Sequence, residues 1–268
     1  MSELHITYKH TSFLIDTKND HYGEAFWRSL EAQQWEPDTL NFLEREIESG
    51  TLLLDIGAAN GSISLIAAAL GARVISYEPN PTVFAVCERN ISLNAALQSQ
   101  ITLQLAAVSS LPAEIKFVEG ANSKIISEIS VGSHSDSATV IPVLSLKDEL
   151  SRFAKEDIKT LIKMDIEGAE FAILHDRESL EAMKLNRVKL LLAVHPGFYR
   201  PINGVRFLKE LRTKIFILRN FFEAMKLFGE LTSFSSISKT NLNPITSKKI
   251  FALLITAGYH EFILDFNN

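Results

Sequence analysis

An apolar run that ends in a glycine turn, TLLLDIG at residues 51–57, constrains the fold of this chain more than any other segment. A continuous run of this kind is typical of a strand buried on both faces of a parallel sheet. The following segment, SISLIAAAL, is suited to a helix, which Gly71 ends. A buried strand, a tight turn and a helix form the first half of a βαβ unit, so the sequence predicts an α/β fold.

The same alternation continues along the chain. Helix starts are indicated by Asn80 followed by Pro81, and by Ser145 with Asp148 three residues later. A helix is expected over Ala169–Met183. Together with the first, we predict strands at residues 51–57, 72–79, 101–109, 160–168, 188–196 and 260–266. This pattern predicts a doubly wound, mostly parallel sheet with helices on both faces.

The chain divides into two parts by composition. Residues 1–50 are expected to form a lead-in of short strands and helices, and residues 51–268 the main domain. Within that domain, residues 201–268 are expected to be mostly helical before a final strand. Residues 119–138 are rich in serine and glycine and predict a surface loop. Three aromatic residues are interpreted as packing residues rather than walls of a binding pocket, namely Trp27, Trp35 and Phe198.

Charge and composition exclude several classes of protein. The net charge is −5 and no long basic run is present, so nucleic acid is not an expected partner. Cys87 is the only cysteine and is expected in the core, which excludes an internal disulfide and a cysteine-rich zinc site. No stretch of about 18 apolar residues predicts a membrane span. The first ten residues do not form the apolar run that is typical of a signal peptide, so we expect a cytoplasmic protein.

The turn after the first predicted strand has the features of a nucleotide-cofactor site. Ligands of open α/β sheets bind at the carboxyl ends of the strands, where glycines allow a close approach of the backbone. Glu78 ends the second strand, and a carboxylate there can accept hydrogen bonds from both hydroxyls of a ribose. The candidate residues of the turn are Asp55, Gly57, Ala58, Asn60 and Gly61.

Two functions that these residues disfavour remain open at this point. A nicotinamide-dependent oxidoreductase requires the pattern G-x-G-x-x-G, but position 59 is alanine and the middle glycine is missing. Asp55 would repel a pyrophosphate, whereas it suits the ammonium and sulfonium of S-adenosylmethionine. The other alternative is a binding module that keeps the fold without catalysis. That interpretation predicts loss of the acidic residues around Asp165, but these residues are all present.

Four segments resemble the FkbM-type methyltransferase family: DIGAANGSISLIAA, YEPNPTVF, ERNISLN with Asn90 and Asn94, and IKMDIEGAE at residues 162–170. The resemblance implies a class I, Rossmann-like methyltransferase sheet with an antiparallel edge strand, for which residues 260–266 are the candidate. It also implies O-methylation of a sugar, glycan or natural product with S-adenosylmethionine as cofactor. On matching positions, the turn residues hold the amino-acid end of the cofactor, Glu78 holds the ribose, and Asn80 and Ala107 lie near the adenine.

The reacting end is predicted at the ends of the fourth and fifth strands. Asp165 and Glu167 lie two residues apart, which places them on one face if the strand persists, and His195 ends the next strand. Asp165 or His195 is a candidate general base for the acceptor hydroxyl. Alternatively, Asp165 and Glu167 bind a divalent cation such as Mg²⁺, which prefers oxygen ligands. For Glu170 we favour a structural role at the start of a helix.

Overall fold

The computed structural model describes residues 3–18, 20–118, 138–154, 156–166 and 170–194, with shorter pieces at 219, 222–223, 226–227, 237–239, 243–244 and 260–266. Several sequence predictions lie outside these residues. They are most of the Ser- and Gly-rich loop, Glu167, His195, Phe198 and most of the helical part at 201–268. No described helix has both the length and the apolar character needed to cross a membrane.

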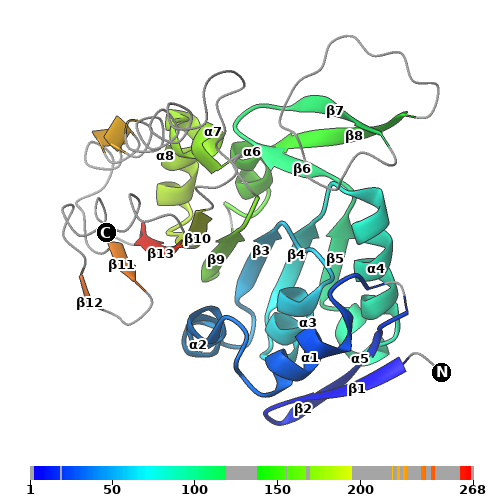
Figure 1. Ribbon diagram of the computed structural model, residues 1–268. Coiled ribbons are helices and arrows are strands. Elements are labelled where there is room, and N and C mark those ends of the chain that lie inside the picture. Colours follow the sequence, from blue (N-terminus) through cyan, green and yellow to red (C-terminus); the bar gives the residue numbers. More distant parts are fainter. Residues whose placement is uncertain are drawn as a thin grey trace, which may run out of the picture.

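A parallel sheet forms the centre of the molecule (Figure 1). Its strand order is β12-β11-β13-β10-β9-β3-β4-β5, parallel from β5 to β10 and antiparallel between β10 and β13. This confirms the doubly wound sheet and its antiparallel last strand. The strands are β3 Leu52–Ile56, β4 Arg73–Tyr77, β5 Ile101–Gln104, β9 Thr160–Met164, β10 Lys189–Val194, β11 Ile237–Lys239, β12 Asn243–Pro244 and β13 His260–Asp265. The chain winds outward in both directions from β3 and β9, so the switch point lies between these two strands.

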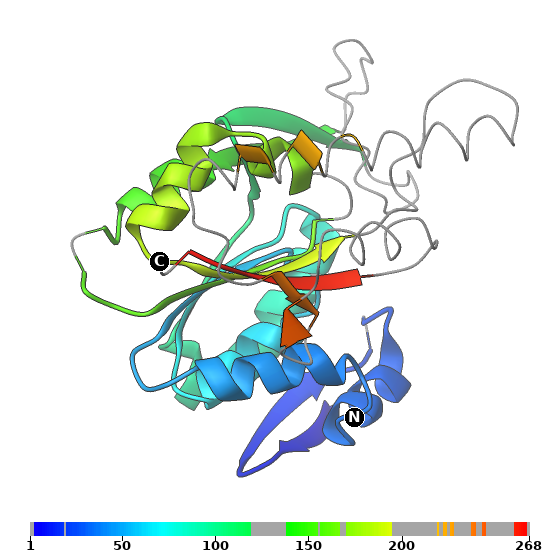
Figure 2. The same ribbon diagram turned by 90° about the vertical axis from the view of Figure 1, so that its left-hand side faces the viewer.

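Both faces of the sheet are buried, as the apolar run of β3 predicts. Leu52, Leu54 and Ile56 belong to one hydrophobic cluster and Leu53 to the other. Helices cover the two faces (Figure 2). On the side of Leu53 lie α2 Pro37–Glu46, α3 Ser62–Ala69, α4 Pro81–Ser92 and α5 Ala95–Gln98, and on the other side α6 Leu146–Ser151, α7 Glu170–Leu174 and α8 Arg177–Leu185. Cys87 is buried in the cluster of Leu53, as expected.

The N-terminal segment packs against α4. It consists of the hairpin β1 Glu3–Tyr8 and β2 Thr11–Asp16, followed by α1 Gly23–Glu31. Asn90 Oδ1 accepts from the N–H of Asp16, and Asn94 Oδ1 accepts from the N–H of Leu14, each at 2.8 Å. The two asparagines noted in the ERNISLN segment therefore attach the hairpin to α4 and to the turn that follows it. Trp27 on α1 is fully buried, which confirms its interpretation as a packing residue.

Two predicted elements are divided in the structure, so these two predictions were wrong in detail. The strand expected at 101–109 ends after Gln104, where the chain turns and Ala106 N–H donates to the Gln104 carbonyl at 3.0 Å. It resumes as β6 Ala107–Ser109, which joins a separate sheet with β8 Ala138–Ser145 and β7 Ala113–Val118. The helix expected over Ala169–Met183 breaks at Asp176, whose carboxylate caps α8 by accepting from Ser179 N–H at 2.8 Å.

Candidate active site

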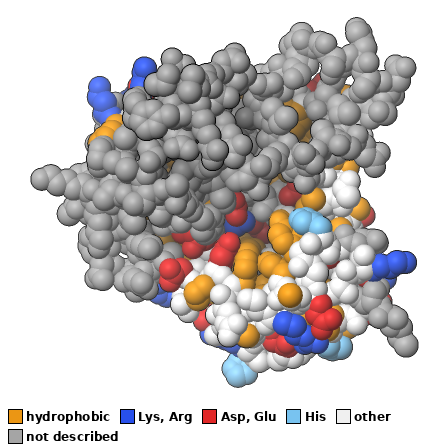
Figure 3. Space-filling model, in the orientation of Figure 1, with side chains coloured by type: hydrophobic (Ala, Val, Ile, Leu, Met, Phe, Trp, Pro, Cys, Tyr) orange, Lys and Arg blue, Asp and Glu red, His pale blue; other side chains and the backbone are white. Residues whose placement is uncertain are grey.

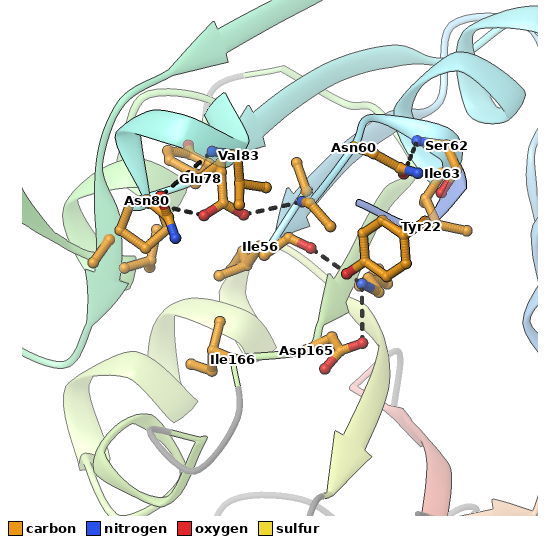
Figure 4. A pocket seen from close by; sticks show the side chains of 18 of the residues that line it. Tyr22, Ile56, Asn60, Ser62, Ile63, Glu78, Asn80, Val83, Asp165 and Ile166 are labelled. Carbon is orange, nitrogen blue, oxygen red and sulfur yellow. Dashed lines mark hydrogen bonds and ion pairs between the residues drawn. The ribbon is translucent and has the colours of Figure 1, made fainter. Parts of the chain in front are cut away.

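A pocket of about 400 Å³ lies at the carboxyl ends of β3, β4 and β9 (Figure 4). This is the place where open α/β sheets bind ligands, and the volume falls in the range of roughly 300–1,000 Å³ found for small-molecule sites. Its walls come from the turn after β3, the end of β4, the start of β6, the end of β9 and the N-terminal segment between His21 and Glu36. Five separate segments therefore meet at one cavity.

The turn after β3 requires glycine at two positions. Gly57 has φ +87°, and a Cβ there would lie 2.0 Å from the backbone oxygen of Asp165. Gly61 has φ +85°, and a Cβ there would lie 2.9 Å from Cys87 Sγ. Both conformations are rare for residues with a side chain, and both sites lack room for one. The close fit of this turn explains the two glycines that the sequence places there.

Asp55 lies one residue before the end of β3, beneath the turn rather than in the pocket wall. Its side chain is fully buried, and Oδ2 accepts from Ser64 Oγ–H at 2.6 Å, while Ser64 also contacts Ser76 Oγ at 2.8 Å. Oδ1 has no hydrogen-bond partner among the described residues. Burial raises the pKa of Asp55, although Lys163 and Ser64 act in the opposite direction. A buried carboxylate with one oxygen unpaired favours a nearby cation.

Glu78 follows β4 and its carboxylate faces the pocket (Figure 4). Oε1 accepts from Asn80 N–H at 2.8 Å and Oε2 accepts from Ala59 N–H at 3.0 Å. Each oxygen retains acceptor capacity for a hydroxyl of a ligand. Burial raises the pKa of Glu78 to about 7, more than these two N–H groups lower it. Glu78 therefore also ties the turn after β3 to the end of β4.

Asn60 lines the pocket, but its polar atoms are engaged with the protein. Its Nδ2 donates to Asp20 Oδ2 at 3.1 Å, its Oδ1 accepts from Ser62 N–H at 3.3 Å, and its backbone oxygen accepts from Asn90 Nδ2 at 2.9 Å. The side chain is 1% exposed. In this structure Asn60 connects the turn to the N-terminal segment and to α4.

The residues predicted near the adenine also lie at the pocket. Asn80 caps α4, accepting from Thr82 N–H at 3.0 Å, as the sequence predicted. Asn80 lines the cavity together with Ala107 at the start of β6 and Ala58 in the turn. Six of the predicted cofactor residues are thus brought to one cavity, Gly57, Ala58, Asn60, Glu78, Asn80 and Ala107, while Asp55 and Gly61 lie behind it.

An ion pair lies at the end of β9, on the opposite side of the pocket from Glu78 (Figure 4). Lys163 Nζ is 3.4 Å from Asp165 Oδ2 and 3.3 Å from the carbonyl oxygen of Gly57, to which it donates. Burial lowers the pKa of Lys163, but Asp165 and Asp55 raise it more, so the net shift is upward and the ammonium remains charged. Lys163 belongs to the IKMDIEGAE segment, and its sequence position alone predicts no role for it.

Of the predicted reacting groups, the structure describes Asp165. Its backbone N–H donates to the Ile56 carbonyl at 3.0 Å, which joins β9 to β3 just before the turn, and its side chain lines the pocket. Glu170 is fully buried at the first residue of α7, in accord with a structural role. Within the described parts of the chain, no group of three or more His, Cys, Asp or Glu side chains has a metal-binding arrangement.

The pocket wall between His21 and Glu36 is not predicted by the sequence patterns. Tyr22, Phe26 and Trp35 line the cavity, so Trp35 is not only the packing residue that we expected. Asp20, which is 6% exposed, holds this segment in place by accepting from Trp27 Nε1 at 2.7 Å and from Asn60 Nδ2. No motif marks these residues, and the density of aromatic side chains was the one available signal.

Several solved structures are similar in fold to this chain. A methyltransferase from Agrobacterium tumefaciens matches with 13% identity and a TM-score of 0.38, over 84% of this chain and 59% of its own. A TehB-like methyltransferase from Corynebacterium glutamicum matches with 9% identity and a TM-score of 0.42, over 92% and 96%. The geranyl diphosphate C-methyltransferase of Streptomyces coelicolor matches with 10% identity and a TM-score of 0.45, over 90% and 80%. This chain thus spans less than two thirds of the Agrobacterium enzyme.

Comparison with curated proteins found no match. The profile of the methyltransferase FkbM domain matches residues 55–216, from the Asp55 turn through β9 and β10. This range is more than half of the 268 residues. The protein therefore belongs to the FkbM methyltransferase family and is an S-adenosylmethionine-dependent methyltransferase.

Proposed function

We propose that the enzyme transfers the methyl group of S-adenosylmethionine to a hydroxyl of a sugar, a glycan or another small natural product. The observation that carries this proposal is the shared cavity of two carboxylates. Glu78 and Asp165 line one pocket on either side of the turn after β3. In this proposal Glu78 binds the ribose and Asp165 faces the reacting hydroxyl.

The cofactor half of the pocket supports the following roles. Glu78 accepts hydrogen bonds from the two ribose hydroxyls. Each of its oxygens accepts one backbone N–H and keeps a second acceptor position for a hydroxyl. The turn residues Gly57 and Ala58 provide a close backbone surface for the amino-acid end. Asp55 acts from beneath the turn, where its buried carboxylate favours a cofactor that carries an ammonium and a sulfonium. Asn80 and Ala107 border the adenine.

A dinucleotide fits this pocket less well. In a dinucleotide site the backbone N–H groups of the glycine turn are directed at the pyrophosphate. Here the N–H of Ala59 is donated to Glu78 Oε2 at 3.0 Å, and the N–H groups of Gly57 and Ala58 are both donated to the Tyr77 carbonyl at 3.0 Å. These donors are used within the protein, which disfavours the oxidoreductase alternative.

Asp165 is the proposed general base. In the transfer, the acceptor oxygen forms a bond to the methyl carbon, the carbon–sulfur bond breaks, and the sulfonium becomes a neutral thioether. The hydroxyl proton passes to the Asp165 carboxylate. Alignment of donor and acceptor can contribute about 7–11 kcal/mol at best, and a general base about 10²–10⁴-fold in rate. His195 and Glu167 remain predicted members of the reacting group.

A divalent cation is not part of this proposal. The Lys163 ammonium already lies 3.4 Å from Asp165 Oδ2, at the carboxylate that a metal would need. A cation bound there would meet a buried positive charge, which costs free energy. The described donors therefore suit an ammonium better than Mg²⁺.

Calorimetry separates the proposed function from its alternatives. S-adenosylmethionine and S-adenosylhomocysteine should bind to the protein, and NAD⁺ should not. Tritium-labelled S-adenosylmethionine should then label a small molecule or glycan from a cell extract, and base-stable ether linkage of the label identifies O-methylation. Binding of NAD⁺ alone would support the oxidoreductase, and failure of all three ligands would support a non-catalytic module.

A further inference from the structure

The N-terminal segment contributes an aromatic wall to the pocket, formed by Tyr22, Phe26 and Trp35. The rings contact one another in sequence. The centroids of Tyr22 and Phe26 are 5.1 Å apart with a 39° angle between planes, and those of Phe26 and Trp35 are 5.0 Å apart at 68°. These arrangements are in the range of favourable aromatic pairs. The wall is therefore a continuous apolar surface rather than three scattered side chains.

The wall is fixed relative to the cofactor turn. Asp20 accepts from Tyr22 N–H at 2.9 Å through Oδ1, and from Trp27 Nε1 and Asn60 Nδ2 through Oδ2. Asp20 thus connects the start of the wall, the core of α1 and the turn after β3. A subsite held in this way is preorganised, which lowers the entropic cost of binding.

Neighbouring residues differ in exposure in a way that indicates a ligand. Trp27 is fully buried and accounts for the packing of this segment, whereas Tyr22 is 43% exposed and lines the cavity. Large exposed aromatics with an accessible face are a common feature of binding sites. The space-filling view shows a patch of apolar side chains bordered by acidic ones on this side of the molecule (Figure 3).

The charges around the cavity limit the ligand further. The described lining residues include three acids, Glu36, Glu78 and Asp165, and one Lys or Arg side chain, Lys163. Lys163 is engaged by Asp165 and the Gly57 carbonyl, so it offers no open anion site. A phosphate or carboxylate on the acceptor would meet repulsion from Glu36 beside the aromatic wall.

We propose that Tyr22, Phe26, Trp35 and Glu36 form the acceptor subsite, and that it takes an uncharged, hydroxyl-bearing ring compound whose apolar face stacks on the aromatic wall. This inference rests on the proposed function, because the bound hydroxyl is the group that receives the methyl. It assigns acceptor recognition to a segment that lies before the matched family domain. It also predicts that acceptors with an anionic ring substituent are rejected.

A matched pair of ligands tests this proposal. Phenyl β-D-glucopyranoside and phenyl β-D-glucuronide differ by a carboxylate in place of a hydroxymethyl group. Each is titrated into the S-adenosylhomocysteine complex while tryptophan emission is recorded, since the protein has two tryptophans. The neutral glycoside should change the emission, and the glucuronide should bind at least about tenfold more weakly. The emission change should disappear in Trp35→Phe, because Trp27 is buried and is not among the residues that line the cavity.

Two substitutions and their controls locate the effect. Tyr22→Ala should weaken binding of the neutral glycoside about three- to tenfold. Leu185→Ala, at a residue that is 75% exposed and outside the pocket, should leave this binding unchanged. Glu36→Gln should reduce the difference in affinity between the neutral glycoside and the glucuronide. Glu88→Gln, at an exposed residue outside the pocket lining, should leave that difference unchanged.

Equal affinity for the two ligands, or no effect of either ligand on Trp35 in a complex that binds S-adenosylhomocysteine normally, would overturn the acceptor subsite. Failure of S-adenosylhomocysteine to bind would instead contradict the proposed function. The two failures are therefore distinguished by the cofactor titration that precedes the ligand pair.

Discussion

The two halves of the pocket are built in different ways. The cofactor half consists of buried backbone and nearly buried polar groups, in which Gly57 has no room for a Cβ and Glu78 is 6% exposed. The acceptor half consists of aromatic side chains from one N-terminal segment, with Tyr22 43% exposed. The first half depends on positions where few residues fit, whereas the second tolerates exchange. We therefore expect substitutions in the turn to remove binding and substitutions in the wall to change acceptor choice.

The largest expected effect is that of Gly57→Ala. The new Cβ would overlap the backbone oxygen of Asp165, and φ is +87°. Together these costs amount to roughly 3 kcal/mol of folding free energy, and the displaced turn should not bind S-adenosylhomocysteine. Denaturant unfolding and calorimetry measure the two effects.

Gly50→Ala is the matched control for this substitution. Gly50 has φ +86° but no atom within 4 Å of the added Cβ. It should cost only about 1 kcal/mol and leave cofactor binding intact. Equal effects of the two substitutions would show that backbone conformation alone, and not the close fit of the turn against β9, limits the cofactor half.

Asp55 and Asp165 should separate binding from turnover. Asp55→Ala should weaken binding of S-adenosylmethionine on the order of 100-fold or more. Asp55→Asn tests whether the charge of Asp55 or its hydrogen bond to Ser64 is responsible. Asp165→Ala should preserve binding and reduce kcat by about 10²–10⁴-fold, with Asp165→Asn as the variant of equal size. Equal loss of binding in the two alanine variants would refute this division of roles.

A smaller effect is expected from pH through Glu78. Its pKa of about 7 in the free protein means that the carboxyl is largely protonated at pH 6 and ionised at pH 8. If the ionised form binds the ribose hydroxyls and the cationic cofactor, the Kd should be about tenfold higher at pH 6 than at pH 8. Glu78→Gln should bind more weakly and lose this dependence between pH 6 and 8, and an unchanged slope in that variant would assign the titration to another group.

The same raised pKa has a consequence for stability with the opposite sign. The native state binds more protons than the unfolded state between the ordinary pKa of glutamate and about 7. The contribution of Glu78 to the free energy of unfolding therefore falls as pH rises through this interval. The Glu78→Gln variant should show a flatter dependence of stability on pH there.

The smallest effect should come from Asn94, which is outside the pocket. Its Oδ1 accepts from Leu14 N–H at 2.8 Å and its Nδ2 donates to the Leu14 carbonyl at 2.7 Å. Asn94→Ala should lower the free energy of unfolding by about 1 kcal/mol and leave the Kd for S-adenosylhomocysteine unchanged. A marked loss of cofactor binding would mean that the hairpin, and not the turn itself, positions the cofactor half.

Sequence patterns were sufficient where local chemistry determines structure. The buried strand that contains Asp55, the cap at Asn80 and the antiparallel strand at 260–266 follow from apolar runs, capping residues and glycine positions, which act over a few residues. The family resemblance draws attention to Asn90 and Asn94, but it does not indicate their role in attaching the hairpin. That role depends on the packing of the hairpin on α4, which no local pattern indicates.

Patterns were insufficient where distant segments meet. The residues from Ala106 to Ser109 are compatible with one long strand, and only the second sheet shows why β6 diverges from β5. The break before α8 had a local signal, since Asp176 and Ser179 form a cap. The position of Lys163 had no local signal, and the aromatic wall had only its density of aromatic side chains. The function of both depends on β3 and β9 lying side by side near the N-terminal segment.

The central claim is that the turn after β3 and the carboxylate of Glu78 together hold S-adenosylmethionine. A crystal structure of the complex with S-adenosylhomocysteine tests it most directly. We expect both ribose hydroxyls within hydrogen-bonding distance of the Glu78 carboxylate, with the sulfur directed toward Asp165 and the aromatic wall. A cofactor bound elsewhere, or bound here with its ribose away from Glu78, would contradict it.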